Sequence, residues 1–166
     1  MFLRALTLAG GLTGAAGLSQ FPEFSQQYLQ RLGGKVEELT RFVEEFDADA
    51  SAVGVSREQA LVDLAQGGGI GAERAQTMVS TIDRQARLST ALEDLRGAGP
   101  FTRAYHANAF TDSELARGTL NDFKPALPLT FEGIVFSVLG FLAGIGVFSF
   151  VSWLFGLISL RRFRGG

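Results

Sequence analysis

The sequence predicts an all-α integral membrane protein in which two transmembrane helices flank a helical, partly coiled-coil periplasmic region. Three observations lead to this class. A long uncharged segment lies near the C-terminus, a shorter one opens the chain, and the region between them carries apolar residues at helical spacing. A single soluble domain would distribute its apolar residues along the chain instead of concentrating them at the two ends.

The C-terminal segment carries the strongest membrane signal. From Ile134 to Leu160 no residue is charged over 27 positions, and 17 of these are Ile, Leu, Val or Phe. A helix of this length measures about 40 Å, whereas the hydrocarbon core of a bilayer is about 30 Å thick. We therefore predict a transmembrane helix at residues 129–160 in preference to a buried core helix, followed by a basic cytoplasmic tail at 161–166.

Residues 1–21 are predicted to form an N-terminal membrane anchor or an uncleaved signal-like segment. Arg4 is the one charged residue there, and Ala5 to Pro22 gives 18 uncharged residues, about enough to cross a thin bilayer. The small residues from Gly14 to Gly17 would also suit a signal-peptide cleavage site, so cleavage stays open as the alternative. We favour the retained anchor.

The predicted periplasmic region, residues 22–128, opens with a heptad pattern. Eight apolar residues alternate spacings of three and four without a miss, as the a and d positions of a coiled coil do. Charged residues occupy the other helix faces, which is typical of a solvated exterior. The seam consists of Leu29, Leu32, Val36, Leu39, Val43, Phe46, Ala50 and Val53.

Small residues recur at helix-packing spacing in both predicted membrane segments. Small side chains let helix backbones approach closely in lipid, where no hydrophobic force draws helices together. We predict helix packing or oligomerisation through these residues, with the alternative that glycine is simply common in membrane helices. The positions are Gly10 and Gly14 in the first segment, and Gly140, Gly144, Ser152 and Gly156 in the second.

Composition argues against several kinds of chemistry. The chain has no cysteine and a single histidine, His106, so Cys-based zinc sites and His-rich metal clusters are not expected. A net charge of −2 offers no basic face for nucleic acid. The one polar constellation, Tyr105, His106 and Asn108, lacks a nucleophile with a base beside it. We predict a protein that is not an enzyme, has no cofactor or metal and binds no nucleic acid.

The charges around the apolar segments predict the topology. Arg4 precedes the first segment and three arginines follow the last, so both termini are expected in the cytoplasm. Residues 19–128 carry 11 basic and 16 acidic residues, and we place this acidic region in the periplasm, on the outer side of a bacterial inner (cytoplasmic) membrane. Aromatic and basic side chains at the boundaries are expected at the membrane interface. They are Phe21, Phe24, Tyr28, Arg161, Arg162 and Arg164.

The stretch LSQFPEFSQQYLQRLGG, residues 18–34, resembles the corresponding segment of a proteobacterial family catalogued as domain of unknown function 2937. The resemblance extends over the whole chain, although this stretch is its specific part. It implies a bacterial inner-membrane protein and favours the retained anchor. It implies no activity and no catalytic residues.

These patterns favour a scaffold-like homo-oligomer in the lipid bilayer, associated through the coiled-coil seam and the glycine-faced membrane helices. The alternative is an accessory subunit of a larger inner-membrane complex, with the seam docked on a partner protein. An oligomeric pore or transporter is less favoured, because neither apolar segment holds a charge that could serve an ion or proton pathway.

Overall fold

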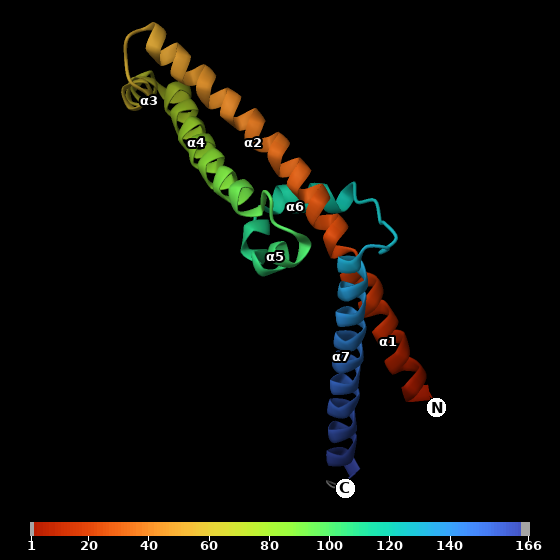
Figure 1. The fold of residues 1–166 in the computed structure, drawn as a ribbon. Coiled ribbons are helices and arrows are strands. Elements are labelled where there is room, and N and C mark those ends of the chain that lie inside the picture. Colours follow the sequence, from red (N-terminus) through yellow and green to blue (C-terminus); the bar gives the residue numbers. More distant parts are fainter. Residues whose placement is uncertain (1, 164–166) are drawn as a thin grey trace. The chain divides into compact units, whose positions relative to one another are not determined.

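The computed structural model describes the backbone of residues 2–163 and the side chains of residues 4–106 and 108–154. All regular structure in this described part is helical, which confirms the predicted all-α class (Figure 1). The elements are α1 (Phe2–Ser19), α2 (Phe21–Ala52), α3 (Arg57–Gln66), α4 (Gly69–Leu95), α5 (Pro100–Tyr105), a 3-10 helix η1 (Ala107–Phe110), α6 (Ser113–Asn121) and α7 (Phe131–Phe163).

The chain divides into two compact units, which we call the terminal unit and the central unit. The terminal unit combines Met1–Gln26 with Asp122–Gly166, and the central unit is Gln27–Asn121. Our sequence-based boundaries lay at residues 21 and 128. The difference arises because the start of α2 and the link at residues 122–130 make contacts with α1 and α7.

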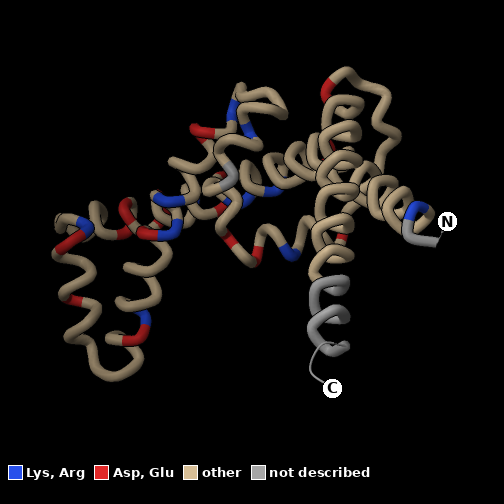
Figure 2. The backbone as a smooth tube through the Cα atoms, turned by 90° about the horizontal axis from the view of Figure 1, so that it is seen from below, with Lys and Arg blue, Asp and Glu red and all other residues tan. Residues whose placement is uncertain are grey.

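In the described part of the chain, one helix is long and apolar enough to cross a membrane. The candidate span runs from Phe131 to Leu154, 24 residues of α7, and only 11% of its most apolar window is buried. Figure 2 shows the contrast with the central unit, whose helices carry charged residues of both signs. The prediction of one C-terminal membrane helix therefore has structural support, and the second span stays a prediction.

Helices α1 and α7 form an antiparallel pair in the terminal unit (Figure 1). Gly10 lies beside Gly144, and Gly14 lies beside Gly140, so the residue order runs in opposite directions along the two helices. The beginning of α1 and the end of α7 therefore lie at the same end of the pair.

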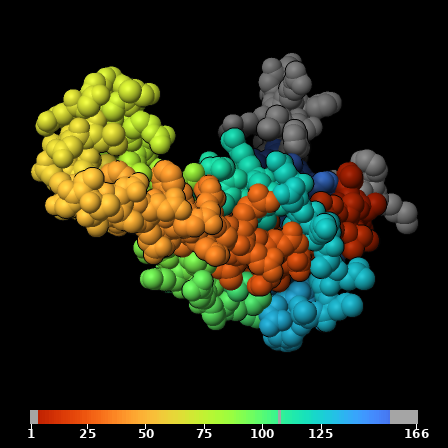
Figure 3. Space-filling view, turned by 90° about the horizontal axis from the view of Figure 1, so that it is seen from above, coloured from red at the N-terminus to blue at the C-terminus, as the bar shows by residue number. Residues whose placement is uncertain are grey.

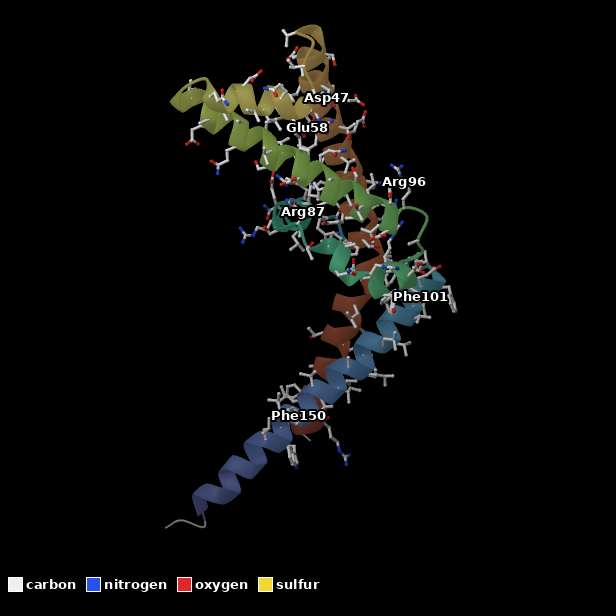
Figure 4. The ribbon with its side chains drawn as sticks, turned by 90° about the vertical axis from the view of Figure 1, so that its left-hand side faces the viewer. Asp47, Glu58, Arg87, Arg96, Phe101 and Phe150 are labelled. Carbon is white, nitrogen blue, oxygen red and sulfur yellow. The ribbon has the colours of Figure 1, made fainter. Side chains whose placement is uncertain are left out.

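The central unit is built on α2 and α4, which run alongside each other in Figures 1 and 4. One face of each helix supplies the core. The Gln85 side chain of α4 donates a hydrogen bond to the Thr40 hydroxyl of α2 at 3.1 Å, which links the two helices beside that core. The buried apolar side chains are Leu32, Leu39, Val43 and Ala50 from α2, with Ala75, Met78, Leu88, Leu92 and Leu95 from α4.

Four of the eight predicted seam residues are thus buried in the core of one chain. Leu29, Val36 and Phe46 are half-buried. Val53 departs from the prediction, because its side chain is 75% exposed. Helix α2 ends at Ala52, and the chain turns at Gly54, whose φ of 76° is a left-handed value that glycine adopts without strain. The heptad pattern therefore runs one position beyond the helix.

Helix α3 closes the far end of the α2–α4 pair. Ser56 caps it by accepting a hydrogen bond from the Gln59 amide at 3.2 Å. The Arg57 guanidinium binds the Asp47 carboxylate of α2, with Nε and Oδ1 2.6 Å apart. At Gly71 an added Cβ would strike the Leu64 carbonyl oxygen, so glycine is required for the close approach of α4 to α3.

We predict that Leu32→Ala lowers the free energy of unfolding of the central unit by about 2–5 kcal/mol, because it leaves a cavity at a side chain with no exposed area. Native-state hydrogen exchange of the α2 and α4 amides in detergent measures this change. The matched variant Val53→Ala removes an exposed seam residue and should shift the same free energy by less than about 0.5 kcal/mol. Equal losses in the two variants would contradict the described core.

Candidate functional site

The first candidate site is the contact between α1 and α7, where four predicted glycines come together. A Cβ added at Gly14 would fall on the Gly140 carbonyl oxygen and lie 3.1 Å from the Gly144 Cα. Added at Gly140 or Gly144, it would fall on the carbonyl oxygen of Gly14 or Gly10. Only glycine permits this backbone-to-backbone approach. The small-residue positions predicted for helix packing thus pack within a single chain.

Sequence reasoning missed a fifth glycine in this contact. A Cβ at Gly11 would lie 2.7 Å from the ring of Phe141 and 3.0 Å from Ile145. Gly11 is buried, and the aromatic ring fills the space that its missing side chain leaves. The adjacent pair Gly10-Gly11 was the available signal, since one glycine per turn would suffice for a single packing stripe.

A groove of about 500 Å³ opens on the same face of the α1–α7 pair. Its lining is almost entirely apolar and small. The one hydroxyl there, that of Thr13, donates to the Ala9 carbonyl oxygen of its own helix at 2.9 Å. The groove therefore presents no unsatisfied hydrogen-bonding group from Thr13. It is lined in part by Ala9, Gly10, Thr13, Gly14, Ala143 and Val147.

The remaining predicted positions on α7 are not part of the glycine contact. Ser152 is half-buried, about two turns beyond Phe148. Gly156, Arg161 and Arg162 fall within the helix but beyond the described side chains, and Arg164 lies outside the described residues altogether.

The three aromatics predicted for the membrane interface have different surroundings. Phe21 packs against Phe136 of α7 with ring centroids 5.3 Å apart, and Phe24 meets the edge of Phe123 at 6.2 Å. Both rings are half-buried and belong to the terminal unit. Tyr28 differs from the prediction, because its side chain has no exposed area and cannot contact lipid.

Tyr28 instead lies in a buried cluster of the central unit. Its ring centroid is 4.7 Å from that of Phe110, and its hydroxyl lies 3.5 Å from the Ala109 carbonyl oxygen. Burial raises the pKa of the Tyr28 phenol, and the negative charge of Asp112 raises it further. A heptad or hydropathy pattern gives no sign of this packing, because Ala109 and Phe110 are more than 80 residues away in sequence.

Asp112 links the Tyr28 cluster to α4. It accepts a hydrogen bond from the Leu115 amide at 2.9 Å, which caps the start of α6, and it binds Arg84 at 3.1 Å. Arg84 also binds Glu114 at 2.7 Å. These charges hold α6 on α4 and serve packing, since each of them is already paired.

The second candidate site is a groove of about 720 Å³ between α2 and α4 of the central unit. Gly33 stands at its edge, and an added Cβ there would meet nothing within 4 Å. Val36 and Leu92 form apolar parts of the wall, and Arg96 stands at the end of α4 (labelled in Figure 4). The other lining residues are Glu37, Thr40, Arg41, Glu44, Ser89 and Glu93.

Neither site brings together groups for chemistry. Among the described residues, no group of three or more His, Asp or Glu side chains could hold a metal ion. His106 and Tyr105 meet only edge to face, with ring centroids 5.4 Å apart, and Tyr105 is 86% exposed. What the two sites share is shape: each is a groove between two helices.

These features define a helical protein with one helix of membrane-spanning length and two interhelical grooves. Residues 2–162 match the family described as "Protein of unknown function (DUF2937)", and the chain belongs to that family. This confirms the resemblance found in residues 18–34. No curated protein and no solved structure matches the chain.

We predict that Gly140→Ala disrupts the α1–α7 pair, because the added Cβ would fall on the Gly14 carbonyl oxygen. Spin labels at Leu8→Cys and Leu142→Cys, both exposed positions, would show a longer or broader distance distribution. Gly146→Ala on the same helix is the matched control, since its Cβ meets nothing within 4 Å, and it should leave the distance unchanged. Identical distributions in the two variants would refute the close contact.

We predict that Tyr28 ionises above its usual pKa of 10.0 and that the central unit loses stability as the pH rises through the raised value. The sign follows because the folded state retains the proton that the unfolded state has released. Phenolate absorbance in Tyr105→Phe, where Tyr28 is the remaining tyrosine, measures this ionisation. Adding Tyr28→Phe should reduce the alkaline loss of stability, and an unchanged loss would contradict the prediction.

Proposed function

We propose that this protein is a non-enzymatic accessory subunit of a larger membrane complex, and that its central unit binds a helix of a partner protein in the groove between α2 and α4. The support is that the α2 seam already has its partner in α4 of the same chain. What α2 and α4 leave open is the groove beside that contact, and an open surface is what a second protein can occupy.

The chemistry of the groove suits an amphipathic helix. Val36 and Leu92 offer apolar surface for the partner's apolar face. Acidic and basic side chains line the same groove, so a partner helix with charges of both signs would find complements along its edges. At Gly33 the absence of a side chain allows a backbone to come close. We therefore expect a partner helix with small or apolar residues facing Gly33 and Val36.

We further propose that α1 and α7 cross the membrane together as a helical hairpin. Large apolar side chains are exposed on the outer faces of both helices, among them Leu8 and Leu12 on α1 and Leu142 and Phe150 on α7 (Figure 4). Lipid would cover these faces. The antiparallel order puts Arg4 at the same end of the pair as the arginine-rich end of the chain, which supports cytoplasmic termini and a periplasmic central unit in a bacterial inner membrane.

The groove on the α1–α7 pair favours a second candidate, self-association within the membrane. Its lining of Ala9, Thr13 and Ala143 would allow a helix of a second copy to approach closely. A scaffold-like homo-oligomer built in this way would use the membrane helices and leave the central groove free for partners.

We predict that the protein purified in mild detergent forms a particle with stoichiometric foreign subunits, and that Gly33→Trp releases them by filling the groove. Native mass analysis of the intact particle measures the composition. Gly34→Trp is the matched control, because Gly34 is exposed, has equal open space and does not line the groove.

Particles that contain several copies of this chain and no other subunit would overturn the accessory-subunit proposal and favour self-association. In that case Ala143→Phe should dissociate the copies, whereas Leu142→Phe, on an exposed residue outside the groove, should not. A particle of one chain alone would overturn both candidates.

A further inference from the structure

The link at residues 122–130 displays apolar side chains in an unusual way. Leu127 is 80% exposed, Leu129 is 83% exposed, and Phe131 at the start of α7 is 73% exposed. These are the highest exposed fractions among the large apolar side chains described in the terminal unit. No charged residue lies between Lys124 and Glu132. Figure 3 shows this segment (cyan) at the surface of the molecule.

The link is held in a defined conformation by the terminal unit itself. The Gln20 side chain donates to the Ala126 carbonyl oxygen at 3.2 Å and accepts from the Ala126 amide at 3.1 Å. We call these two bonds the Gln20 clamp. Within the link, the Leu129 amide donates to the Leu127 carbonyl oxygen at 2.8 Å.

The junction of the link with α7 is fixed as well. Thr130 caps α7 by accepting a hydrogen bond from the Gly133 amide at 3.1 Å. Pro128 lies so close to Gly133 that an added Cβ there would be 2.9 Å from the Pro128 Cβ. Leu127, Leu129 and Phe131 are therefore presented by an ordered backbone, which loses little conformational entropy when these side chains bind something.

The position of these residues along the chain indicates what covers them. Phe131 is the first residue of the candidate span, and the 24 residues to Leu154 extend over about 36 Å, somewhat more than the hydrocarbon thickness of about 30 Å. The start of α7 and the residues just before it therefore lie at the level of the lipid headgroups and upper acyl chains. Exposed apolar and aromatic side chains at that level are stabilised by lipid contact.

We propose that the link is a membrane-interface element whose Leu127, Leu129 and Phe131 side chains insert into the upper acyl region of the bilayer that α7 crosses. The inserted side chains fix the depth of α7 at this end, and the Gln20 clamp ties that depth to α1. The inference rests on the proposed function only in that α7 spans the membrane. Its occupant is lipid, and a protein partner is an outcome of the test.

Single cysteines test the inference directly, because the chain contains none of its own. Leu127→Cys and Leu129→Cys are labelled with a polarity-sensitive fluorophore, and each full-length variant is reconstituted in phosphatidylethanolamine and phosphatidylglycerol vesicles. The vesicles carry a quencher either near the top of the acyl chain or near its end. Val138→Cys on α7 reports the span, and Ala65→Cys, an exposed residue of α3, reports the aqueous background.

We expect the labels at 127 and 129 to lose more fluorescence to the shallow quencher than to the deep one. The label at 138 should be quenched at greater depth, and that at 65 should be unaffected. Quenching at 138 with none at 127 and 129 would overturn the inference and leave the proposed span intact. No quenching at 138 would overturn the span itself. A blue-shifted emission at 127 and 129 that neither quencher changes would identify a protein partner in place of lipid.

Discussion

The backbone contact between Gly14 and Gly140 is the constraint on which the terminal unit depends. A membrane offers no hydrophobic force between helices, so close packing has to supply the attraction between α1 and α7. At these positions the carbonyl oxygens occupy the space where side chains would start. Once the two helices are held this closely, Phe21 reaches Phe136, and Gln20 at the end of α1 reaches the link. The apolar outer faces then form one continuous surface.

The central unit shows how a coiled-coil pattern can be satisfied without a second molecule. A heptad seam states that a helix has an apolar partner, and it does not state which chain the partner comes from. Here α4 of the same chain buries Leu32, Leu39 and Val43. Self-association of this protein therefore does not need the α2 seam, and the surfaces left for other molecules are the grooves beside the paired helices.

Periodic features could be predicted from the sequence, and contacts between distant residues could not. The helical class, the C-terminal apolar helix and the glycine positions follow from residue spacing, because each depends on neighbours within a few turns. The burial of Tyr28 depends on Phe110, and the Gln20 clamp joins residues 106 positions apart. Tyr28 resembles an interfacial aromatic when only its neighbours in sequence are considered. Its true surroundings arise from α5, η1 and α6, which carry no strong period of their own.

The pairing of α1 with α7 also has a consequence for biosynthesis under the proposed topology. Helix α1 is complete at Ser19, but its glycine-matched partner begins at Phe131 and is the last helix to be made. At typical translation rates, the interval between them is on the order of 10 s. During that time the glycine face of α1 has no helix to pack against. A membrane insertase or the lipid itself must shelter it, so the order of synthesis makes α1 the helix most dependent on assistance.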